Sequence, residues 1–375
     1  MATQPAESIH SVNISPAPGE LSGVEKRWVS WQPYLLSQGY QLRPRYRPGW
    51  VPSWISSGAN PYDCEDSINS LPVRTLDAMR IEDDTQVVIK ILLPSNEDRE
   101  GAEELEILQH LSSNSCQSDP TNHCVPCLDS FPIPDVSNGT FYVMPLLRQY
   151  DDPPFYNLRE IHGFLTQAFQ GLQFLHKNNI AHCDIASPNM MMGGRILYNE
   201  PFHPFSQYLT LDGKRSIRPR YTRSQRNTQY YYIDFGYAKW FRNPDEPHTV
   251  TGSRAREPTP EQLAGEPYDP FKADIYQLGA ILRRDLIPKY PTLRFLLPLA
   301  REMTDRDPDK RPTLERAHQA MNTQFAGIPG WKTRWPIAPS NAAFRQRSMY
   351  FLAGVVTEVM QALRRVLRSV FFLSS

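Results

Sequence analysis

The sequence predicts an α+β protein with two lobes, a small antiparallel sheet carrying one helix and a larger, mainly helical lobe. Two strand-like runs, VRTLDAMRI and QVVIKIL, flank the polar turn EDDT, and the helical segment REGAEELEILQHL and the strand FYVMPLL follow. After these, apolar residues recur at spacings of three and four in LREIHGFLTQAFQGLQFLH, as they do on one face of a helix. The apolar face of that helix consists of Ile161, Leu165, Ala168, Leu172 and Leu175. Further helices are expected in DIYQLGAILRRDLI and around LRFLLPLAREM.

The composition indicates a globular chain without a dominant charge. Its 375 residues are 40% apolar, enough for a sizeable core. Lysine and arginine together number 40, as do aspartate and glutamate, so no overall field attracts nucleic acid, and no nucleic-acid partner is expected. The first twenty residues contain no apolar core of a secretory signal, which favours an intracellular, cytoplasmic location.

The five cysteines predict reduced thiols rather than a disulfide framework. Cys124 and Cys127 form one CxxC beside His123, which leaves a zinc clip as an alternative. A second pair of ligands at similar spacing is missing from the sequence, so buried or loop thiols are the preferred interpretation.

Residues 1–72 predict an irregular extension. The run RWVSWQPYLLSQGYQLRPRYRPGWVPSW interleaves Trp, Tyr, Arg and Pro so densely that no long helix or regular strand is expected. We predict an extended strap held by its aromatic side chains, and the alternative is an exposed arm that binds peptide or nucleic acid.

A group of charged and amide residues has the spacing that phosphoryl transfer requires. The segment from His182 to Asn189, HCDIASPN, resembles the catalytic loop of protein kinases, in which an aspartate and an asparagine five residues later serve as base and metal ligand. Asp184 and Asn189 match these two places. The run YYYIDFG resembles the kinase Asp-Phe-Gly element, and there Asp234 matches the magnesium ligand.

The first lobe has the matching nucleotide-binding elements. Val87-Val88-Ile89-Lys90 resembles the third-strand lysine motif, in which the lysine pairs with the phosphates and with a helix glutamate. By spacing, Glu104 is preferred for that glutamate over its acidic neighbours. The same resemblance makes Met144 the gatekeeper and Pro145 to Leu147 the hinge that would bind adenine.

Later segments extend the resemblance over roughly residues 73–325. These are Pro260-Glu261, the helix beginning Asp274-Ile275-Tyr276, and the signature DPDKRP. The segments RPRYRPGWVPSW and NHCVPCLDSF are also similar in sequence to kinase-like proteins of mushroom-forming fungi. The resemblance implies a bilobal protein kinase-like fold, with an extension over 1–72, an N-lobe over 73–148, a C-lobe over 149–326 with an insert at about 193–229, and a tail over 327–375.

Three features of the sequence depart from the kinase pattern. No glycine occurs from Leu71 to Ile89, so the glycine-rich loop that covers the phosphates is missing from its expected place. Cys183 replaces the arginine that clamps a phosphorylated activation loop. Ala186 stands where serine/threonine kinases usually have a lysine near the transferred phosphate, so the acceptor type stays open, with Ser/Thr as the default.

Two basic segments lie outside the chemistry. The insert contains GKRSIRPRYTRSQR, for which a solvated surface loop is preferred over a dock for an acidic partner. Leu352 to Leu373 predicts an amphipathic helix with apolar residues on one face and Arg364, Arg365 and Arg368 on the other. Such helices bind membrane surfaces, so peripheral membrane contact is one expectation; packing on the helical lobe or on another chain is the alternative.

The leading hypothesis from sequence is a protein kinase that uses ATP and Mg²⁺ and phosphorylates an unidentified protein. Asp184 would orient the acceptor hydroxyl, with Lys90, Asn189 and Asp234 holding nucleotide and metal. Two alternatives stay open: a pseudokinase that acts as a binding module, and a small-molecule phosphotransferase, which shares the catalytic loop but usually lacks DIYQLG and the DPDKRP signature.

Overall fold

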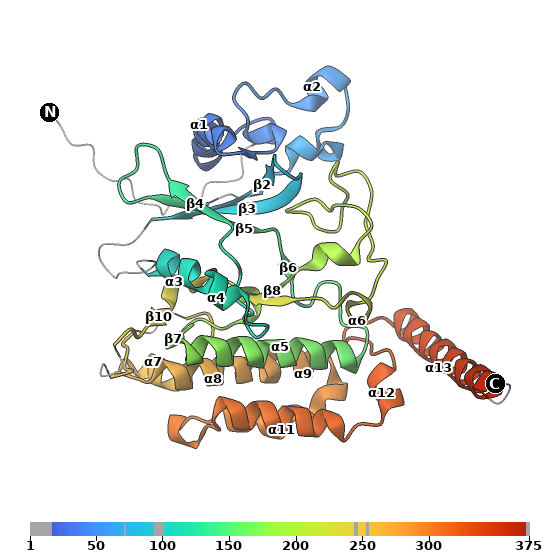
Figure 1. The fold of residues 1–375 in the computed structure, drawn as a ribbon. Coiled ribbons are helices and arrows are strands. Elements are labelled where there is room, and N and C mark those ends of the chain that lie inside the picture. Colours follow the sequence, from blue (N-terminus) through green and yellow to red (C-terminus); the bar gives the residue numbers. More distant parts are fainter. Residues whose placement is uncertain are drawn as a thin grey trace. The chain divides into compact units, whose positions relative to one another are not determined.

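The described residues of this computed structural model form two compact units (Figure 1). They are 17–70, 73–93, 101, 103–243, 247–252 and 255–372, with backbone alone for 364–372. Unit 1 comprises those within Met1–Leu93, Leu128–Leu146 and Glu200–Arg218, and unit 2 comprises those within Pro94–Cys127, Leu147–Asn199 and Pro219–Ser375.

Unit 1 is built on a five-stranded antiparallel sheet with strand order β1-β2-β3-β5-β4. The strands are β1 (Tyr40–Gln41), β2 (Thr75–Arg80), β3 (Thr85–Leu92), β4 (Asp129–Pro132) and β5 (Thr140–Pro145). The hairpin expected around EDDT is confirmed, because Arg80 pairs with Thr85 across a turn formed by residues 81–84. The predicted α+β kinase-like fold class is confirmed by this sheet and by the helices of unit 2.

The prediction of an irregular N-terminal segment without a long helix or strand is wrong. Helix α1 (Gly23–Ser37) has 15 residues and includes Pro33, and β1 joins the sheet. Ser22 and Glu25 form a reciprocal cap at the start of α1, which satisfies two of its first N–H groups. Burial of Trp28 and Leu35 outweighs the unfavourable effect of an internal proline, about 3 kcal/mol.

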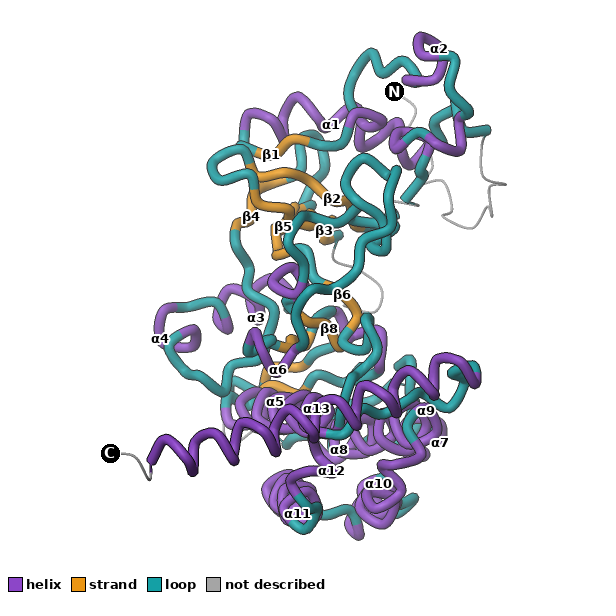
Figure 2. Tube along the Cα trace, turned by 90° about the vertical axis from the view of Figure 1, so that its right-hand side faces the viewer, coloured by secondary structure: helices purple, strands orange, loops and turns teal. Residues whose placement is uncertain are grey.

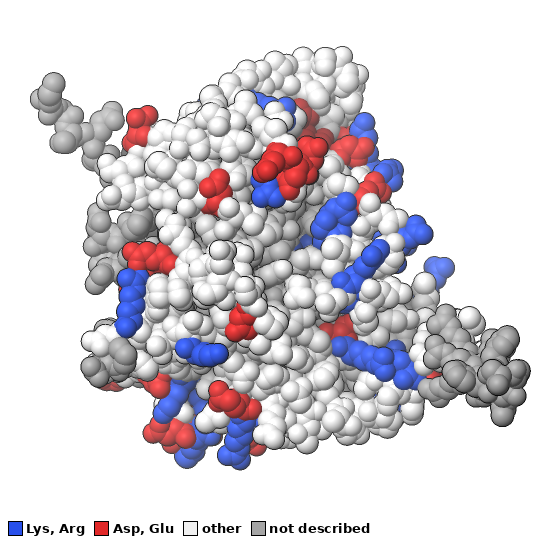
Figure 3. Space-filling model, in the orientation of Figure 1, with Lys and Arg blue, Asp and Glu red and all other residues white. Residues whose placement is uncertain are grey.

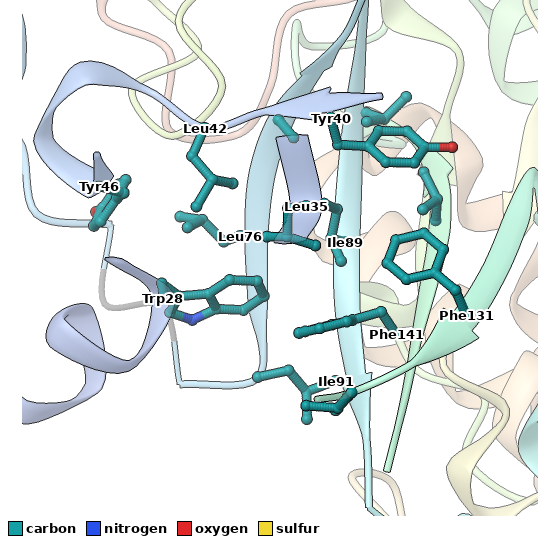
Figure 4. Packing of buried hydrophobic residues seen from close by; sticks show 14 residues of the cluster. Trp28, Leu35, Tyr40, Leu42, Tyr46, Leu76, Ile89, Ile91, Phe131 and Phe141 are labelled. Carbon is teal, nitrogen blue, oxygen red and sulfur yellow. The ribbon is translucent and has the colours of Figure 1, made fainter. Parts of the chain in front are cut away.

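The core of unit 1 lies between α1 and the sheet (Figure 4). The rings of Trp28 and Phe141 are 5.8 Å apart, and Tyr40 stacks on Phe131 at 5.8 Å. Trp28 has no exposed surface, so α1 is part of this core rather than an appendage. Burial of a large aromatic side chain contributes about 2 to 3 kcal/mol, which accounts for the dense aromatic run in the sequence.

The connection from β1 to β2, residues 42–74, is held by buried ion pairs and hydrogen bonds. It contains α2 (Ser53–Ser57) and the short helices η1 (Pro44–Tyr46), η2 (Pro61–Asp63) and η3 (Glu65–Ser67). Arg43 contacts Asp77 at 2.9 Å and Glu65 at 2.8 Å, and Arg45 binds Glu25 at 2.6 Å. The guanidinium of Arg45 is almost completely buried, so this ion pair holds the connection, called the strap below, against α1.

Unit 2 is mainly helical. Figures 1 and 2 show its long helices α5 (Leu158–Lys177), α8 (Pro270–Ala280) and α11 (Leu314–Ala326) in successive layers. The predicted apolar face of α5 is confirmed, because Ile161, Leu165 and the residues that follow at the same spacing are buried. The other helices of eight or more residues are α3 (Glu104–Leu111) and α13 (Phe344–Phe372). The shorter helical segments are α4 (Asn114–Gln117), η4 (Ser187–Asn189), η5 (Gly194–Leu197), α6 (Arg223–Arg226), η6 (Phe235–Tyr237), α7 (Pro260–Ala264), η7 (Ile281–Leu286), α9 (Ile287–Lys289), η8 (Pro291–Leu296), α10 (Leu297–Met303), η9 (Pro308–Lys310) and α12 (Gly330–Arg334).

Two small sheets in unit 2 carry its functional loops. One has the order β6-β8-β9, from β6 (Arg148–Gln149), β8 (Met190–Met192) and β9 (Tyr230–Tyr232). The other pairs β7 (Ile180–Ala181) with β10 (Lys239–Trp240). Residues 182–189 therefore connect the two sheets.

The insert differs in part from the expected solvated loop. Lysine and arginine gather on the right-hand side of Figure 3, and Lys214, Arg215 and Arg218 are exposed, as predicted. Arg223, however, is buried in unit 2, where its guanidinium contacts Glu160 and the carbonyl oxygens of Tyr150 and Pro154. A buried cation needs such partners, so this end of the insert is structural.

Two structural features are absent from the described residues. None of the helices there has the length and apolarity needed to cross a membrane. No three His, Cys, Asp or Glu side chains there are arranged to hold a metal ion, so the zinc clip at Cys124 and Cys127 gains no support. Burial instead raises the pKa of the Cys124 thiol, which disfavours the thiolate that zinc requires.

Candidate active site

Asp274 of α8 holds the segment HCDIASPN in place through hydrogen bonds to its backbone. The carboxylate of this fully buried residue accepts hydrogen bonds from the backbone N–H groups of His182 and Cys183, both at 2.8 Å. Cys183 has a φ of 63°, a left-handed conformation that a non-glycine residue rarely adopts. The two hydrogen bonds to one carboxylate stabilise this strained turn. The sequence motif included Asp274, but its anchoring role becomes visible only here.

Asp184 and Asn189 meet within this loop. The amide nitrogen Nδ2 of Asn189 donates to the backbone oxygen and to Oδ2 of Asp184, each at 2.8 Å. Both residues are almost completely buried. Gln277 of α8 accepts the N–H of Ile185 at 2.8 Å and so fixes the backbone between them. The loop therefore presents the Asp184 carboxylate in one defined orientation.

Asp234 follows β9 and comes to the same end of the small sheet as Asn189, because β8 and β9 are antiparallel neighbours. Asp234 has a left-handed φ of 65°, and its side chain is 37% exposed. His182 joins the two loops: its Nδ1 accepts the N–H of Asp184 at 3.3 Å, and its Nε2 lies 3.1 Å from the carbonyl oxygen of Ile233. The ring of His182 also packs on Phe235 at 5.0 Å.

Glu104 of α3 lies beside the Asp-Phe-Gly segment. A Cβ atom built on Gly236 would be 3.6 Å from Oε2 of Glu104 and 3.7 Å from Oδ1 of Asp234. Glu104 is 3% exposed, whereas its neighbours point elsewhere: Glu103 accepts the N–H of Trp240 at 3.2 Å, and Glu106 pairs with Arg242. Among the three, the geometry favours Glu104 as the functional glutamate.

Lys90 and Met144 lie on adjacent strands of unit 1. Lys90 of β3 is opposite Tyr142 of β5, with its ammonium 5.8 Å from the centre of the tyrosine ring, and Met144 is opposite Val88. Leu147 belongs to unit 2 and is buried. Because Lys90 and Glu104 belong to different units, the ion pair between them stays a prediction.

Arg256 is a site residue that the sequence interpretation missed. Its backbone N–H donates to Oδ1 of Asp184 at 2.6 Å, and its Nε lies 3.6 Å from Oδ2 of the same carboxylate. Its Nη2 is 4.0 Å from Oδ2 of Asp234. One cation therefore lies next to both acidic residues. The available signal was an arginine shortly before the Pro260-Glu261 element, but spacing to Asp184 cannot be read from a segment without regular structure.

Electrostatics at Asp184 reflect two opposing effects. Burial, the larger one, raises the pKa of its carboxyl group. The N–H of Arg256 and the nearby His182 lower the pKa, but less than burial raises it. A carboxylate with a raised pKa is a better proton acceptor when ionised, which suits a residue that receives the proton of a hydroxyl.

The place of the glycine-rich loop is corrected by the sheet topology. Lys90 lies on the third strand of the sheet, so the connection between the first two strands is residues 42–74, rather than the stretch from Leu71 to Ile89 that contains no glycine. This connection contains Gly49 and Gly58, both with positive φ, but at turns of a Trp- and Pro-rich strap. The described part of this connection, residues 42–70 and 73–74, contains the short helices η1, α2, η2 and η3 rather than a single tight turn.

The family assignment comes from comparison with known families. The family model described as "Protein kinase domain" matches residues 74–294, more than half of the chain. The chain therefore belongs to the protein kinase family. A search of curated proteins finds no match.

Proposed function

We propose that this protein is an active kinase that transfers the γ-phosphoryl group of ATP to a protein hydroxyl, with serine or threonine as the default acceptor. The observation that carries the proposal is the pairing of Asp184 with Asn189 at 2.8 Å in a loop anchored by Asp274. Asp184 orients the acceptor hydroxyl and receives its proton at a carboxylate oxygen.

The residues present fit a bound magnesium ion. Since Nδ2 of Asn189 is used by Asp184, its oxygen Oδ1 faces the other way, and Asp234 offers a partly exposed carboxylate. Oxygen ligands of this kind are the ones that Mg²⁺ takes. When bound with ATP, the ion neutralises negative charge on the phosphates. Lys90 would hold the phosphates, and Met144 and Leu147 would line the adenine side.

Arg256 complements Ala186 in this proposal. The alanine leaves no cation on the catalytic loop near the transferred group, while Arg256 brings one within 3.6 Å of Asp184 and 4.0 Å of Asp234. Positive charge held at the developing transition state is one of the larger contributions to phosphoryl transfer. We propose that Arg256 supplies this charge.

The rival function is a pseudokinase, and one observation favours it. The long strap between β1 and β2, residues 42–74, supports the proposal that the phosphates are covered poorly and that ATP affinity is weak. The third possibility, a small-molecule phosphotransferase, is less well supported, because such enzymes usually lack the DPDKRP signature. Here Arg311 of that signature forms a buried bidentate pair with Glu261 at 2.6 and 2.7 Å.

The test is thermal unfolding of the full chain with and without millimolar MgATP, followed by phosphate transfer to a mixture of protein substrates. A ligand at 100 times its dissociation constant stabilises the folded state by about 2.7 kcal/mol. We expect a magnesium-dependent rise in the midpoint that is lost in Asp234→Asn and kept in the surface control Asp309→Asn. A chain without any rise and without transfer would be the pseudokinase.

A further inference from the structure

Helix α13 exposes its apolar side, whereas an amphipathic helix of a soluble protein usually packs that side against the core. Its apolar side faces outward, with exposed fractions from 40% at Val355 to 85% at Phe344. The large exposed apolar residues are Phe344, Met349, Phe351, Leu352, Val355, Val356, Val359, Met360 and Leu363. A soluble helix normally buries such a face, so its exposure indicates an interaction surface.

The inward side of α13 includes one row of residues spaced by four, and Phe351 beside that row also contacts Trp335, with ring centres 5.8 Å apart. Tyr350 approaches Tyr156 with ring centres 6.3 Å apart, Gly354 packs against Trp335, and Glu358 pairs with Arg334 at 3.2 Å. A Cβ atom on Gly354 would be 2.6 Å from Cε2 of Trp335, so only glycine permits this approach. These contacts fix the rotation of the helix, and with it the outward direction of the apolar side.

We infer that α13 binds an anionic membrane surface, with its apolar side in the lipid and its axis along the surface. The helix sequence carries Arg345, Arg347, Arg364, Arg365 and Arg368 against Glu358 alone. Glu358 is already paired with Arg334. The helix therefore has an excess of positive charge, which complements anionic headgroups.

Two other features favour the membrane over a second copy of the chain. Trp331 of α12 is 49% exposed next to Lys332, and aromatic and basic side chains together are typical of the membrane–water interface. Two copies that met through this face would bring their arginine-rich helices together, and like charges would repel. Within unit 2, Figures 1 and 2 show α13 on the outside of the layers formed by α5, α8 and α11.

The experiment is vesicle flotation of the full chain with phosphatidylcholine vesicles, with and without about a third phosphatidylserine, and it does not depend on kinase activity. The variant Leu352→Glu/Val356→Glu places two charges on the outward side. The matched control, Val51→Glu/Ile55→Glu, makes the same change at two exposed positions of unit 1 with the same spacing. Light scattering of each protein records its oligomeric state.

We expect at least tenfold stronger binding to the anionic vesicles than to the neutral ones. The α13 variant should lose at least tenfold of that binding, and the control should stay within twofold of the unmodified chain. Replacing Arg364, Arg365 and Arg368 by Gln should remove the preference for anionic lipid. Equal failure to float with both vesicles, or a dimer that only the α13 variant dissociates, would overturn the inference.

Discussion

The catalytic loop of unit 2 and the β1–β2 connection of unit 1 use buried polar residues in opposite ways. In the loop, Asp274 and Gln277 bind backbone N–H groups and leave the Asp184 carboxylate directed by Asn189 and Arg256. In the connection, the guanidinium groups of Arg43 and Arg45 are bound by the carboxylates of Glu65 and of Glu25, the latter in α1. The first region presents a carboxylate, whereas the second has its charged groups paired within unit 1.

From this difference we expect that a mutation can affect phosphoryl transfer and nucleotide binding separately in this protein. The unit 2 residues that we propose to act on the transferred group are held by buried partners. The β1–β2 connection is instead a strap held by hydrogen bonds such as that of Ser53 to Asp66 and by the pair of Arg45 with Glu25 of α1. We therefore expect slow or weak nucleotide binding together with intact transfer chemistry.

The largest effect should come from Asp184→Asn. Removing a positioned general base lowers the rate by about 10²- to 10⁴-fold. The rate of phosphate transfer at saturating MgATP should decrease by that factor. The MgATP-induced rise in the unfolding midpoint should be kept. Asp309→Asn, at an exposed surface pair, is the control and should leave the rate unchanged. An unchanged rate in Asp184→Asn would remove this residue from the catalytic machinery.

Breaking the buried ion pair that holds the strap should lower the free energy of unfolding. Glu25→Ala leaves Arg45 buried without its carboxylate partner, and breaking a buried pair in this way costs about 3 to 5 kcal/mol. Urea denaturation followed by tryptophan fluorescence measures the change, since Trp28 is in this core. The exposed pair formed by Arg80 and Asp83 provides the control, because Arg80→Ala should give no measurable shift. A similar loss of stability in Glu25→Ala and Arg80→Ala would contradict the view that the buried pair contributes more than the exposed one.

Arg256 should have an intermediate effect. We expect Arg256→Ala to reduce transfer by about 10- to 100-fold, equal to roughly 1.4 to 2.7 kcal/mol of transition-state stabilisation. Adding Ala186→Lys to that variant should restore part of the rate, since it returns a cation to the catalytic loop. A rate that rises in Arg256→Ala would instead show that the arginine blocks the site. A purely structural role predicts no rescue by the lysine.

The smallest effect should be on pH dependence. Burial raises the pKa of Asp184, so the acidic limb of the pH–rate profile should lie above the ordinary aspartate value of about 3.9. Both the backbone N–H and the guanidinium charge of Arg256 lower the pKa of this carboxyl group. Arg256→Ala removes the charge and keeps the N–H, so the limb should move to still higher pH. Activity falls as pH decreases through this limb because the base becomes protonated. A limb that does not move on mutation would indicate that another group titrates.

The sequence by itself determined the fold class and the elements with strong periodicity. The hairpin around EDDT and the buried face of α5 follow from patterns of two and of 3.6 residues, which are local properties of the chain. The candidate residues Lys90, Glu104, Asp184, Asn189 and Asp234 also came from spacing, because motif residues lie close together in sequence.

The tertiary structure alone decided the rest, because long-range packing and buried partners are not written in local sequence. A helix with an internal proline, α1, forms because Trp28 and Leu35 bury against distant strands. Arg256 reaches Asp184 from 72 residues away through an irregular segment. The outward side of α13 is set by contacts with Trp335 and Arg334 rather than by its own periodicity.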